Sequence, residues 1–356
     1  GHAQIGCEVN GEILFPYTYP YLSGTTKILI DNFRELQEQC VALNIIDSNS
    51  FVVDIGSNDG TLLSHFEENG VRVLGIEPSQ AGDVAQEKGI ETLRAYFSKE
   101  TSLVVAEHYG KADLVTAANV FAHISDPHEI VEGVIEMLKP EGVFVSESHY
   151  LGDLIRTVQY DTIYHEHLRY YHLDVLRYLF DSHGLEVFRV ERIKTHGGSI
   201  RVFAAKKGTW AVDESVPALL AEETAFGLVD GTAYSEFRQR VFESKWALNG
   251  LLARLKSEGK RVFGVGAPSR ASTLINFVGI DEGCVEVVLE VASSHKLNKF
   301  IPGTKIPVVE ESVLYSEQPD FVLLFSWHIA DDLIKNIESK GFKGQFIIPL
   351  PEPFIA

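Results

Sequence analysis

Cysteine and methionine are both scarce in this chain of 356 residues. The three cysteines, Cys7, Cys40 and Cys284, lie far apart in the sequence, which suits a reducing cytoplasm and argues against a disulfide framework. Met137 is the only methionine, so the chain does not begin at an initiator. We therefore expect the native protein to have further residues before Gly1.

Long apolar runs and an excess of positive charge are also missing. No stretch of about eighteen apolar residues and no signal-peptide pattern occurs, so the sequence indicates neither a membrane span nor secretion. We expect a cytoplasmic protein. The net charge of −19 disfavours a nucleic-acid partner, because phosphate binding needs a concentrated basic face. An anionic ligand would have to be bound locally, by helix N-termini or a few arginines and lysines.

The first half of the chain alternates apolar strand-like segments with helical ones. Seven strands are predicted, at 51–55, 71–79, 91–97, 112–120, 141–150, 185–193 and 199–207. The alternation predicts a parallel, doubly wound α/β sheet. The last two strands are joined only by "KTHGG", which is too short for a helical crossover, so the seventh strand should be antiparallel.

The second half begins with a helical, charged region at 211–258. A strand, a glycine loop and a helix follow in "RVFGVGAPSRASTLINF" at 261–277. Three more strands are predicted at 284–290, 321–326 and 345–349. Because the length of the chain exceeds that of one typical domain, we expect a second, smaller α/β domain here.

The turn "DIGSNDG" joins the first strand to a helix and contains Gly56 and Gly60. Glycines permit positive φ and close approach of a ligand, and a helix N-terminus favours negative charge. Glu77, at the end of the next strand, can accept hydrogen bonds from both hydroxyls of a ribose. The alternative is a tight structural turn with a surface glutamate, since the turn does not match G-x-G-x-x-G.

Taken with the antiparallel seventh strand, these features resemble the class I S-adenosylmethionine-dependent methyltransferases. The resemblance implies S-adenosylmethionine as the cofactor and a seven-stranded Rossmann-like sheet. It also implies a set of cofactor-binding residues: Gly56, Ser57, Asn58 and Gly60 around the methionine part, Glu77 at the ribose, and Asn119 and His123 beside the sulfonium.

A closer resemblance extends along nearly the whole chain. Its blocks are "FPYTYPYLSGTT" (15–26), "VVDIGSNDGTLL" (52–63), "YDTIYHEHLRYY" (160–171), "THGGSIRVF" (195–203), "GVGAPSRASTLINF" (264–277), "PGTKIPV" (302–308) and "IIPLPEP" (347–353). Together they resemble the bacterial nucleotide-sugar C-methyltransferases. The resemblance implies methylation of carbon 3 of a dTDP- or GDP-linked 4-keto-6-deoxy sugar, with methylation at carbon 5 as the nearest alternative.

The resemblance also predicts the domain boundaries. Members of the family begin with a small zinc-binding module, and residues 1–26 resemble the remnant and linker that follow it. Residues 27–208 would form the methyltransferase domain and residues 209–356 a C-terminal domain that helps to bind the sugar nucleotide. Because Cys7 alone cannot complete a four-ligand site, we expect no structural zinc in this chain.

The segment Tyr164-His165-Glu166-His167 resembles the catalytic motif of this family. Carbon methylation beside a ketone needs a base for the α-proton and donors for the enolate oxygen. Histidine suits the first task, because its pKa lies near neutral pH. The resemblance implies His167 as the base, Tyr164 near the keto oxygen and Glu166 as an orienting group, with Tyr21 (or, failing that, Tyr19) as a further catalytic tyrosine. His165 is assigned no role.

Two other interpretations of this segment stay open. With His149 and His172 nearby in sequence, the histidines could bind zinc or iron, although spacing alone does not establish a metal geometry. Alternatively, the segment is a polar loop of hydrogen-bonded histidines. The methyltransferase architecture disfavours both, and we predict no metal ligands.

Candidate substrate-binding residues lie in two glycine-containing segments. They are His196 and Arg201 in "HGGSIR", and Ser269, Arg270 and Lys296 in and after "GVGAPSR", where relatives more often have Ala-Lys at the Ser269-Arg270 positions. From its place in the alternation of the strand, Arg201 either contacts a phosphate or faces solvent. A glycine loop before a helix can hold a pyrophosphate. It can also hold NAD, with Glu290 on the ribose, so an NAD-linked sugar oxidoreductase is an alternative function. A catalytically idle sugar-nucleotide binding protein is a third.

Overall fold

The computed structural model describes residues 3–356, whose contacts divide into two compact units. Unit 1 comprises the residues up to Asp153 together with His165–Asp230, and unit 2 comprises Leu154–Tyr164 together with Gly231–Ala356. Gly1 and His2, which open the predicted remnant, lie outside the described residues. The domain boundaries predicted after residues 26 and 208 stay predictions; the compact units divide after Asp230.

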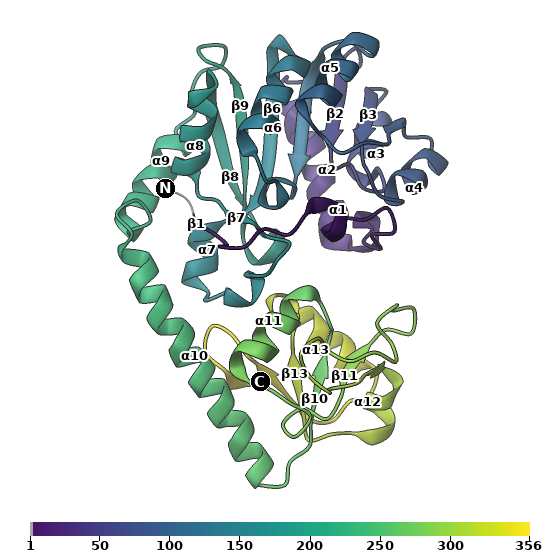
Figure 1. The fold of residues 1–356 in the computed structure, drawn as a ribbon, viewed down its shortest axis with the longest axis vertical. Helices are drawn as coiled ribbons and strands as arrows, with labels where there is room; N and C mark the ends of the chain where they lie inside the picture. The colour runs from purple at the N-terminus through teal and green to yellow at the C-terminus, as the bar shows by residue number, and fades with distance from the viewer. Residues whose placement is uncertain (1–2) are drawn as a thin grey trace. The chain divides into compact units, whose positions relative to one another are not determined.

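Unit 1 is built on the predicted seven-stranded sheet (Figure 1). Its strands are β2 (Phe51–Ile55), β3 (Arg72–Ile76), β4 (Thr92–Leu93), β5 (Ala112–Ala118), β6 (Leu138–His149), β8 (Leu185–Ile193) and β9 (Ser199–Lys206), in the order β4-β3-β2-β5-β6-β9-β8. The last strand, β9, runs antiparallel to both of its neighbours. The predicted fold class, with an antiparallel seventh strand, is confirmed.

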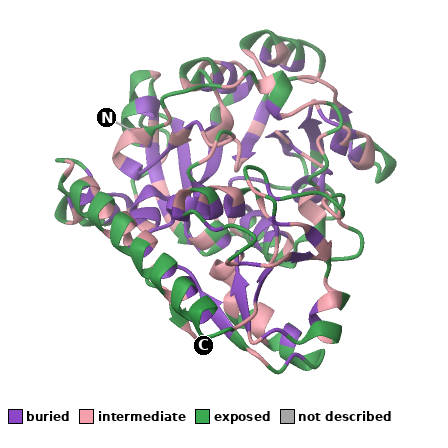
Figure 2. Cartoon of the chain, turned by 60° about the horizontal axis from the view of Figure 1, so that its bottom comes forward, coloured by how far each residue is buried: buried purple, intermediate pink, exposed green. Residues whose placement is uncertain are grey.

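Helices cover both faces of this sheet, because its strands are apolar on both sides. Val53 and Ile55 belong to the core on one face, and Val52 to the core on the other. The first face is covered by α5 (Lys99–His108), α6 (Pro127–Met137), α8 (Leu173–Ser182) and α9 (Ser215–Phe226), and the second by α2 (Lys27–Ala42), α3 (Thr61–Glu67) and α4 (Ala81–Glu87). Figure 2 shows the central strands buried and the outer sides of the helices exposed. The sheet is therefore a doubly wound layer between two layers of helix.

Short elements surround the carboxyl ends of the strands. They are β1 (Ala3–Gln4), α1 (Gly11–Leu14), η1 (Ser23–Thr25), η2 (Phe121–His123), α7 (Leu151–Arg156), β7 (Arg169–Tyr170) and η4 (Thr195–Gly197), whereas η3 (Tyr160–Thr162) belongs to unit 2. β1 pairs antiparallel with β7, and the amide of Ile5 donates to the carbonyl of Leu168 at 3.0 Å. The N-terminal residues are thereby tied to the segment that follows the histidine-rich motif.

Unit 2 contains a second, six-stranded sheet with the order β12-β11-β10-β13-β14-β15. Its elements are α10 (Thr232–Ser257), β10 (Val262–Val265), α11 (Ser269–Val278), β11 (Val288–Glu290), β12 (Val308–Glu310), α12 (Ser312–Glu317), β13 (Phe321–Leu324), η5 (Trp327–Ile329), α13 (Ala330–Ser339), β14 (Gln345–Ile348) and β15 (Phe354–Ile355). The first five strands in this order are parallel, and β15 is antiparallel to β14. A second α/β unit is confirmed; β12 and β15 were not predicted.

Within residues 3–356, the structure has no helix that combines the length and the apolar character needed to cross a membrane.

Candidate functional site

The first glycine turn connects β2 to α3 and has a left-handed backbone at three positions. Gly56 has φ +67°, Asn58 φ +51° and Gly60 φ +74°. A Cβ placed on Gly56 would lie 2.6 Å from Cγ2 of Val120, which follows β5. Glycine is therefore required at this position both by the backbone conformation and by the close approach of the neighbouring loop.

Glu77 lies directly after β3 and is held against this turn. Its Oε2 accepts from the amide of Asn58 at 3.0 Å, and its Oε1 accepts from the amide of Ser79 at 2.8 Å. The carboxylate is thus fixed in orientation, while each oxygen retains a further lone pair for a hydroxyl. The hydroxyl of Ser57 is buried and has no hydrogen-bond partner among the described residues. An orphaned donor beside an oriented carboxylate fits a polar ligand such as S-adenosylmethionine.

The N-terminal segment lies on the glycine turn, which the sequence did not predict. Asn58 accepts from the amide of Ser23 at 2.8 Å and donates from Nδ2 to the carbonyl of Tyr21 at 3.0 Å. Asn58 therefore holds the segment that carries the candidate catalytic tyrosines to the predicted cofactor turn.

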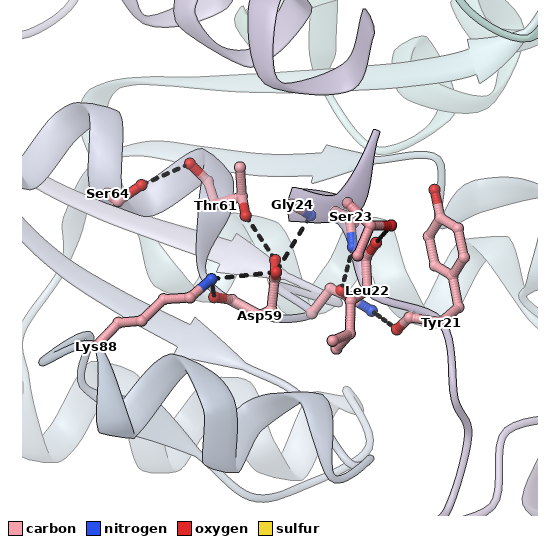
Figure 3. Close-up of polar contacts among 10 residues, drawn as sticks. Tyr21, Leu22, Ser23, Gly24, Asp59, Thr61, Ser64 and Lys88 are labelled. Atoms are coloured by element: carbon pink, nitrogen blue, oxygen red, sulfur yellow. Dashed lines mark hydrogen bonds and ion pairs between the residues drawn. The ribbon is translucent and has the colours of Figure 1, made fainter. Parts of the chain in front are cut away.

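Asp59, the next residue of the turn, adds a second attachment (Figure 3). Its Oδ2 accepts from the amide of Gly24 at 3.1 Å and from Nζ of Lys88 at 3.1 Å. Its Oδ1 accepts from the hydroxyl of Thr61 at 2.6 Å. A buried carboxylate with these donors is satisfied, so Asp59 stabilises the turn and does not need a ligand to do so.

Asp54, near the end of β2, is a buried carboxyl group that the sequence analysis missed. Burial raises the pKa of Asp54 to about 7, against the effect of the hydrogen bond that Thr116 donates to it at 2.6 Å. A cation bound near this turn would favour the ionised form of Asp54. A polar residue inside an otherwise apolar strand was the signal in the sequence.

The carboxyl end of β5 brings His123 next to the candidate catalytic motif, Tyr164-His165-Glu166-His167. Nδ1 of His123 lies 2.7 Å from the carbonyl oxygen of Glu166, and the rings of His123 and His167 have centroids 5.2 Å apart. Since a carbonyl only accepts, Nδ1 of His123 carries the proton. Burial lowers the pKa of His123, so the ring is neutral near pH 7 and its Nε2 is an acceptor. Two imidazoles thus lie together, with the backbone carbonyl of Glu166 beside them.

Of the two candidate tyrosines, the structure brings Tyr19 to this group. Its hydroxyl lies 3.5 Å from Oε2 of Glu166, a long hydrogen bond, and burial together with the charge of Glu166 raises its pKa. Tyr19 therefore stays protonated and can donate. The side chain of Tyr21 is 42% exposed, and its carbonyl, not its hydroxyl, is the group bonded to the glycine turn. The structure thus favours the fallback, Tyr19, over Tyr21.

We expect Tyr19→Phe to reduce turnover by about 10²-fold, because it removes a proton donor beside Glu166. Tyr21→Phe is the matched control, with the same atom deleted two residues away, and should keep turnover within about threefold of the unchanged protein. Initial rates at saturating cofactor would check both. The reverse order of effects would return the catalytic role to Tyr21.

Tyr164 and His165, the first two residues of the motif, are partly or fully exposed to solvent. Tyr164 is half-buried and belongs to unit 2, whereas His165 is exposed and belongs to unit 1.

His172 was considered as a metal ligand, but its Nδ1 lies 2.9 Å from Oε2 of the buried Glu223. Over residues 3–356, no group of three or more His, Cys, Asp or Glu side chains is arranged to hold a metal ion.

The prediction that Arg201 contacts a phosphate is not supported by its position. Arg201 is fully buried on β9, where Nε donates to Oε1 of Glu147 at 2.6 Å. Nη1 donates to Gln39 at 2.6 Å, and Nη2 donates to the carbonyl and side chain of Asn32. Because none of its surface is exposed, Arg201 is a structural cation.

His196, the other candidate of this segment, is exposed in η4 with φ +56°.

In unit 2 the second glycine loop joins β10 to α11. Ser269 begins α11, and Nζ of Lys296 donates to the carbonyl of Ala267 at 2.6 Å. The amide of Ala267 donates to Oε1 of Glu290 at 2.5 Å. The structure therefore places the ammonium of Lys296 at the loop that leads into the N-terminus of α11, as a phosphate site would need.

Arg270 is directed elsewhere and does not support the predicted phosphate contact. Nε and Nη2 of Arg270 donate to the two carboxylate oxygens of Asp161 at 2.7 and 2.9 Å, and Nη1 lies 3.1 Å from Nδ1 of His328. Because Asp161 neutralises it in a buried ion pair, Arg270 is not a free cation for a ligand.

Comparison with known proteins is consistent with this arrangement. A family model described as a methyltransferase domain matches residues 29–190, and one described as a C-methyltransferase C-terminal domain matches residues 194–351. The C-methyltransferase NovU of Streptomyces niveus is 35% identical over 350 residues, which cover 97% of this chain and 82% of NovU. A ubiquinone biosynthesis O-methyltransferase of Escherichia coli is 32% identical over 101 residues, 27% of this chain and 41% of the relative.

Two solved methyltransferase structures each match about half of this chain. Magnesium protoporphyrin IX methyltransferase from Synechocystis PCC 6803, solved with bound SAH, shares 15% identity at a TM-score of 0.40, covering 50% of this chain and 83% of its own. A methyltransferase from Clostridium acetobutylicum shares 15% identity at a TM-score of 0.41, covering 50% and 92%. These values carry no argument about function. The match to NovU, at 35% identity over nearly the full length, establishes the family. The chain belongs to the S-adenosylmethionine-dependent C-methyltransferases.

Proposed function

We propose that this enzyme transfers a methyl group to carbon 3 of a nucleotide-linked 4-keto-6-deoxy sugar through an enolate. The observation that carries the proposal is the grouping of Tyr19, His123, Glu166 and His167 at the carboxyl end of β5. In α/β sheets this edge is where ligands bind. A protonated phenol, a carboxylate and imidazoles able to accept a proton are the groups that enolate chemistry needs.

In the proposed reaction His167 removes the proton from the carbon next to the ketone, and the C–H electron pair moves into a carbon–carbon double bond. The negative charge develops on the keto oxygen. Hydroxyl donors of Tyr164 and Tyr19 would stabilise this oxygen, because protonated phenols donate hydrogen bonds to a developing oxyanion. Glu166 orients Tyr19 through the contact between their side-chain oxygens. The nucleophilic carbon would then bond to the methyl group of the donor as the methyl–sulfur bond breaks, so that S-adenosylhomocysteine leaves, the ketone re-forms and the abstracted proton stays on His167.

The cofactor supplies an electrophilic methyl group at its sulfonium when bound. Gly56, Ser57, Asn58 and Gly60 would hold its methionine part, and the oriented carboxylate of Glu77 its ribose hydroxyls. Asn119 has φ +62°, and its amide donates to the carbonyl of Glu147 at 2.9 Å, which holds this loop to β6; the next residue, Val120, lies against Gly56 of the turn. Asn119 and His123 remain our candidates for the groups beside the sulfonium.

For the sugar nucleotide we propose the second glycine loop as the diphosphate site. The supporting observations are the ammonium of Lys296 at Ala267 and the start of α11 at Ser269. Lys296 donates to a backbone carbonyl of this loop, whereas Arg270 donates to the carboxylate of Asp161; a diphosphate would replace Glu290 as the acceptor of the Ala267 amide. His196 stays a candidate contact for the sugar.

Thermal unfolding with S-adenosylhomocysteine, dTDP, GDP and NAD added separately tests the ligands. A ligand at one hundred times its dissociation constant stabilises by about 2.7 kcal/mol, a midpoint shift of several degrees. We expect shifts with S-adenosylhomocysteine and with one of the two nucleoside diphosphates. A shift with NAD alone would contradict the proposal and favour the oxidoreductase alternative.

Turnover tests the reaction itself. With S-adenosylmethionine and a 4-keto-6-deoxyglucose linked to the nucleotide that binds, NMR should show a new methyl group on carbon 3. In D₂O with S-adenosylhomocysteine in place of the methyl donor, the proton on carbon 3 should exchange, because the enolate forms without methyl transfer. A methyl group on carbon 5 would relocate the reaction, and no product from either nucleotide-linked sugar would refute the substrate class.

A further inference from the structure

Asp161 is a buried carboxylate of unit 2 that lies three residues before the catalytic Tyr164. It has no solvent exposure, and both of its oxygens are occupied. Arg270 donates to Oδ2 and Oδ1 at 2.7 and 2.9 Å, and the indole nitrogen of Trp327 donates to Oδ2 at 2.9 Å. A bidentate guanidinium with a third donor defines the position of a carboxylate closely, because the planar fork fits in one orientation.

The rest of the segment Leu154–Tyr164 is attached to the same unit. Arg240 of α10 donates to the carbonyls of Ile155 and Arg156 at 3.3 and 2.9 Å, and the ring of Tyr160 lies 5.1 Å from that of Phe277. Residues far apart in sequence thus hold a segment whose only regular structure after α7 is one short turn, η3. A single 3₁₀ turn has too few hydrogen bonds to maintain its own geometry.

The chain passes from unit 2 to unit 1 between Tyr164 and His165, inside the catalytic motif. On the unit 1 side, the amide of Leu168 donates to the carbonyl of Ala122 at 2.7 Å, and β7 pairs with β1. Glu166 and His167 are therefore supported by unit 1, whereas Tyr164 follows the anchor at Asp161. The two halves of one four-residue motif have separate supports.

We propose that Asp161 is a positioning residue for methyl transfer, held by Arg270 and Trp327 and acting through Tyr164. It touches no reacting atom. It determines where η3 ends and hence where the backbone of Tyr164 begins, so that the phenol meets the keto oxygen. The activity test of this inference rests on the proposed function above; the exchange test below does not.

A double-mutant cycle tests the action through Tyr164. We expect Asp161→Asn to lower kcat by about tenfold or more with KM changed by less than about threefold, since substrate affinity is not its task. In a Tyr164→Phe background the same substitution should lower kcat by less than about threefold, because the hydroxyl that Asp161 positions is already gone. Equal losses in both backgrounds would overturn the inference, since a general structural role gives additive effects.

Two further variants control this cycle. Asp320→Asn removes another carboxylate of unit 2, bonded to Lys260 at 3.0 Å, and should leave kcat unchanged. Trp327→Phe retains the aromatic ring and deletes one donor to Asp161, so it should reproduce the kcat loss at reduced size. This milder variant decides the question if Asp161→Asn does not fold.

Hydrogen exchange provides a readout without substrate. In the full chain saturated with S-adenosylhomocysteine, Asp161→Asn should speed exchange of the amides of Thr162 and Ile163, which donate to Gln159 and Tyr160 at 3.1 and 3.0 Å. The amide of Leu168, held in unit 1, should be unaffected. Unchanged exchange at Thr162 and Ile163 would refute the anchor, whether or not any sugar is turned over. Faster exchange without turnover of any tested sugar would mean that only the proposed substrate is wrong.

Discussion

Replacement of His167 by Asn should reduce methyl transfer by about 10²- to 10⁴-fold, the range that general bases contribute. Asparagine has a similar polar shape, but its amide cannot accept a proton near neutral pH. Of the candidate cofactor residues, Gly56, Ser57, Asn58, Gly60 and Glu77 lie on the β2–α3 turn and after β3, so S-adenosylhomocysteine should bind nearly as before. Single-turnover product formation and calorimetric titration of S-adenosylhomocysteine would measure the two effects on the same preparation.

His123→Asn is the matched comparison, because His123 is the second imidazole of the group. Its Nδ1–H is given to the carbonyl of Glu166, so the substitution should loosen the motif and reduce turnover less than His167→Asn does. Turnover retained in His167→Asn and lost in His123→Asn would assign the base to Nε2 of His123. Loss of S-adenosylhomocysteine binding in His167→Asn would show instead that the substitution disturbs the cofactor site.

The sequence was most informative where one physical constraint decides the structure. The segment Phe51–Ile55, apolar except for Asp54, predicts a strand covered on both faces, and it is buried throughout. The short connection between β8 and β9 permits only an antiparallel pair. Gly56 and Gly60 were correctly placed at a turn where the backbone is left-handed. Each of these inferences depends on residues close in sequence.

Inferences that depended on distant partners were less successful. Alternation along β9 left Arg201 free to face solvent, but Glu147 lies directly across the strand pair and α2 covers both. Arg270 was assigned to a phosphate by its place at a helix start, whereas its partner Asp161 is far upstream in the chain. Neither partner is visible without the register of the sheet or the path of the loop.

Loop side chains posed a different problem. Tyr19 and Tyr21 occupy similar positions in "YPY", and nothing in their composition indicates which hydroxyl reaches Glu166. The choice follows from the attachment of the segment to Asn58 and Asp59, which uses backbone groups of Tyr21, Ser23 and Gly24. Such contacts involve amides and carbonyls that every residue has, so the side-chain pattern gave no signal for them.

Replacement of Arg201 by Met should lower the free energy of unfolding by about 3–5 kcal/mol, because it leaves a buried carboxylate without its cation. Glu147 is fully buried, and apart from Arg201 its side chain accepts only from Nδ2 of Asn32, at 2.8 Å, among the hydrogen bonds of the described residues. Arg177→Met deletes an exposed arginine paired with Asp174 and should cost less than about 1 kcal/mol. Urea unfolding followed by circular dichroism, with the two units fitted separately, compares them.

The double variant Arg201→Met/Glu147→Met separates loss of the ion pair from loss of volume. If Arg201→Met destabilises the protein because the carboxylate of Glu147 is left buried without a cation, replacing Glu147 as well should restore most of the free energy of unfolding. Buried ion pairs can often be replaced by apolar side chains at little cost in stability. The phosphate interpretation makes the opposite prediction. It requires Arg201→Met to weaken dTDP or GDP binding while the unfolding free energy stays near that of Arg177→Met. The geometry argues against that outcome, because a ligand would have to displace Glu147, Gln39 or Asn32 to reach the buried guanidinium.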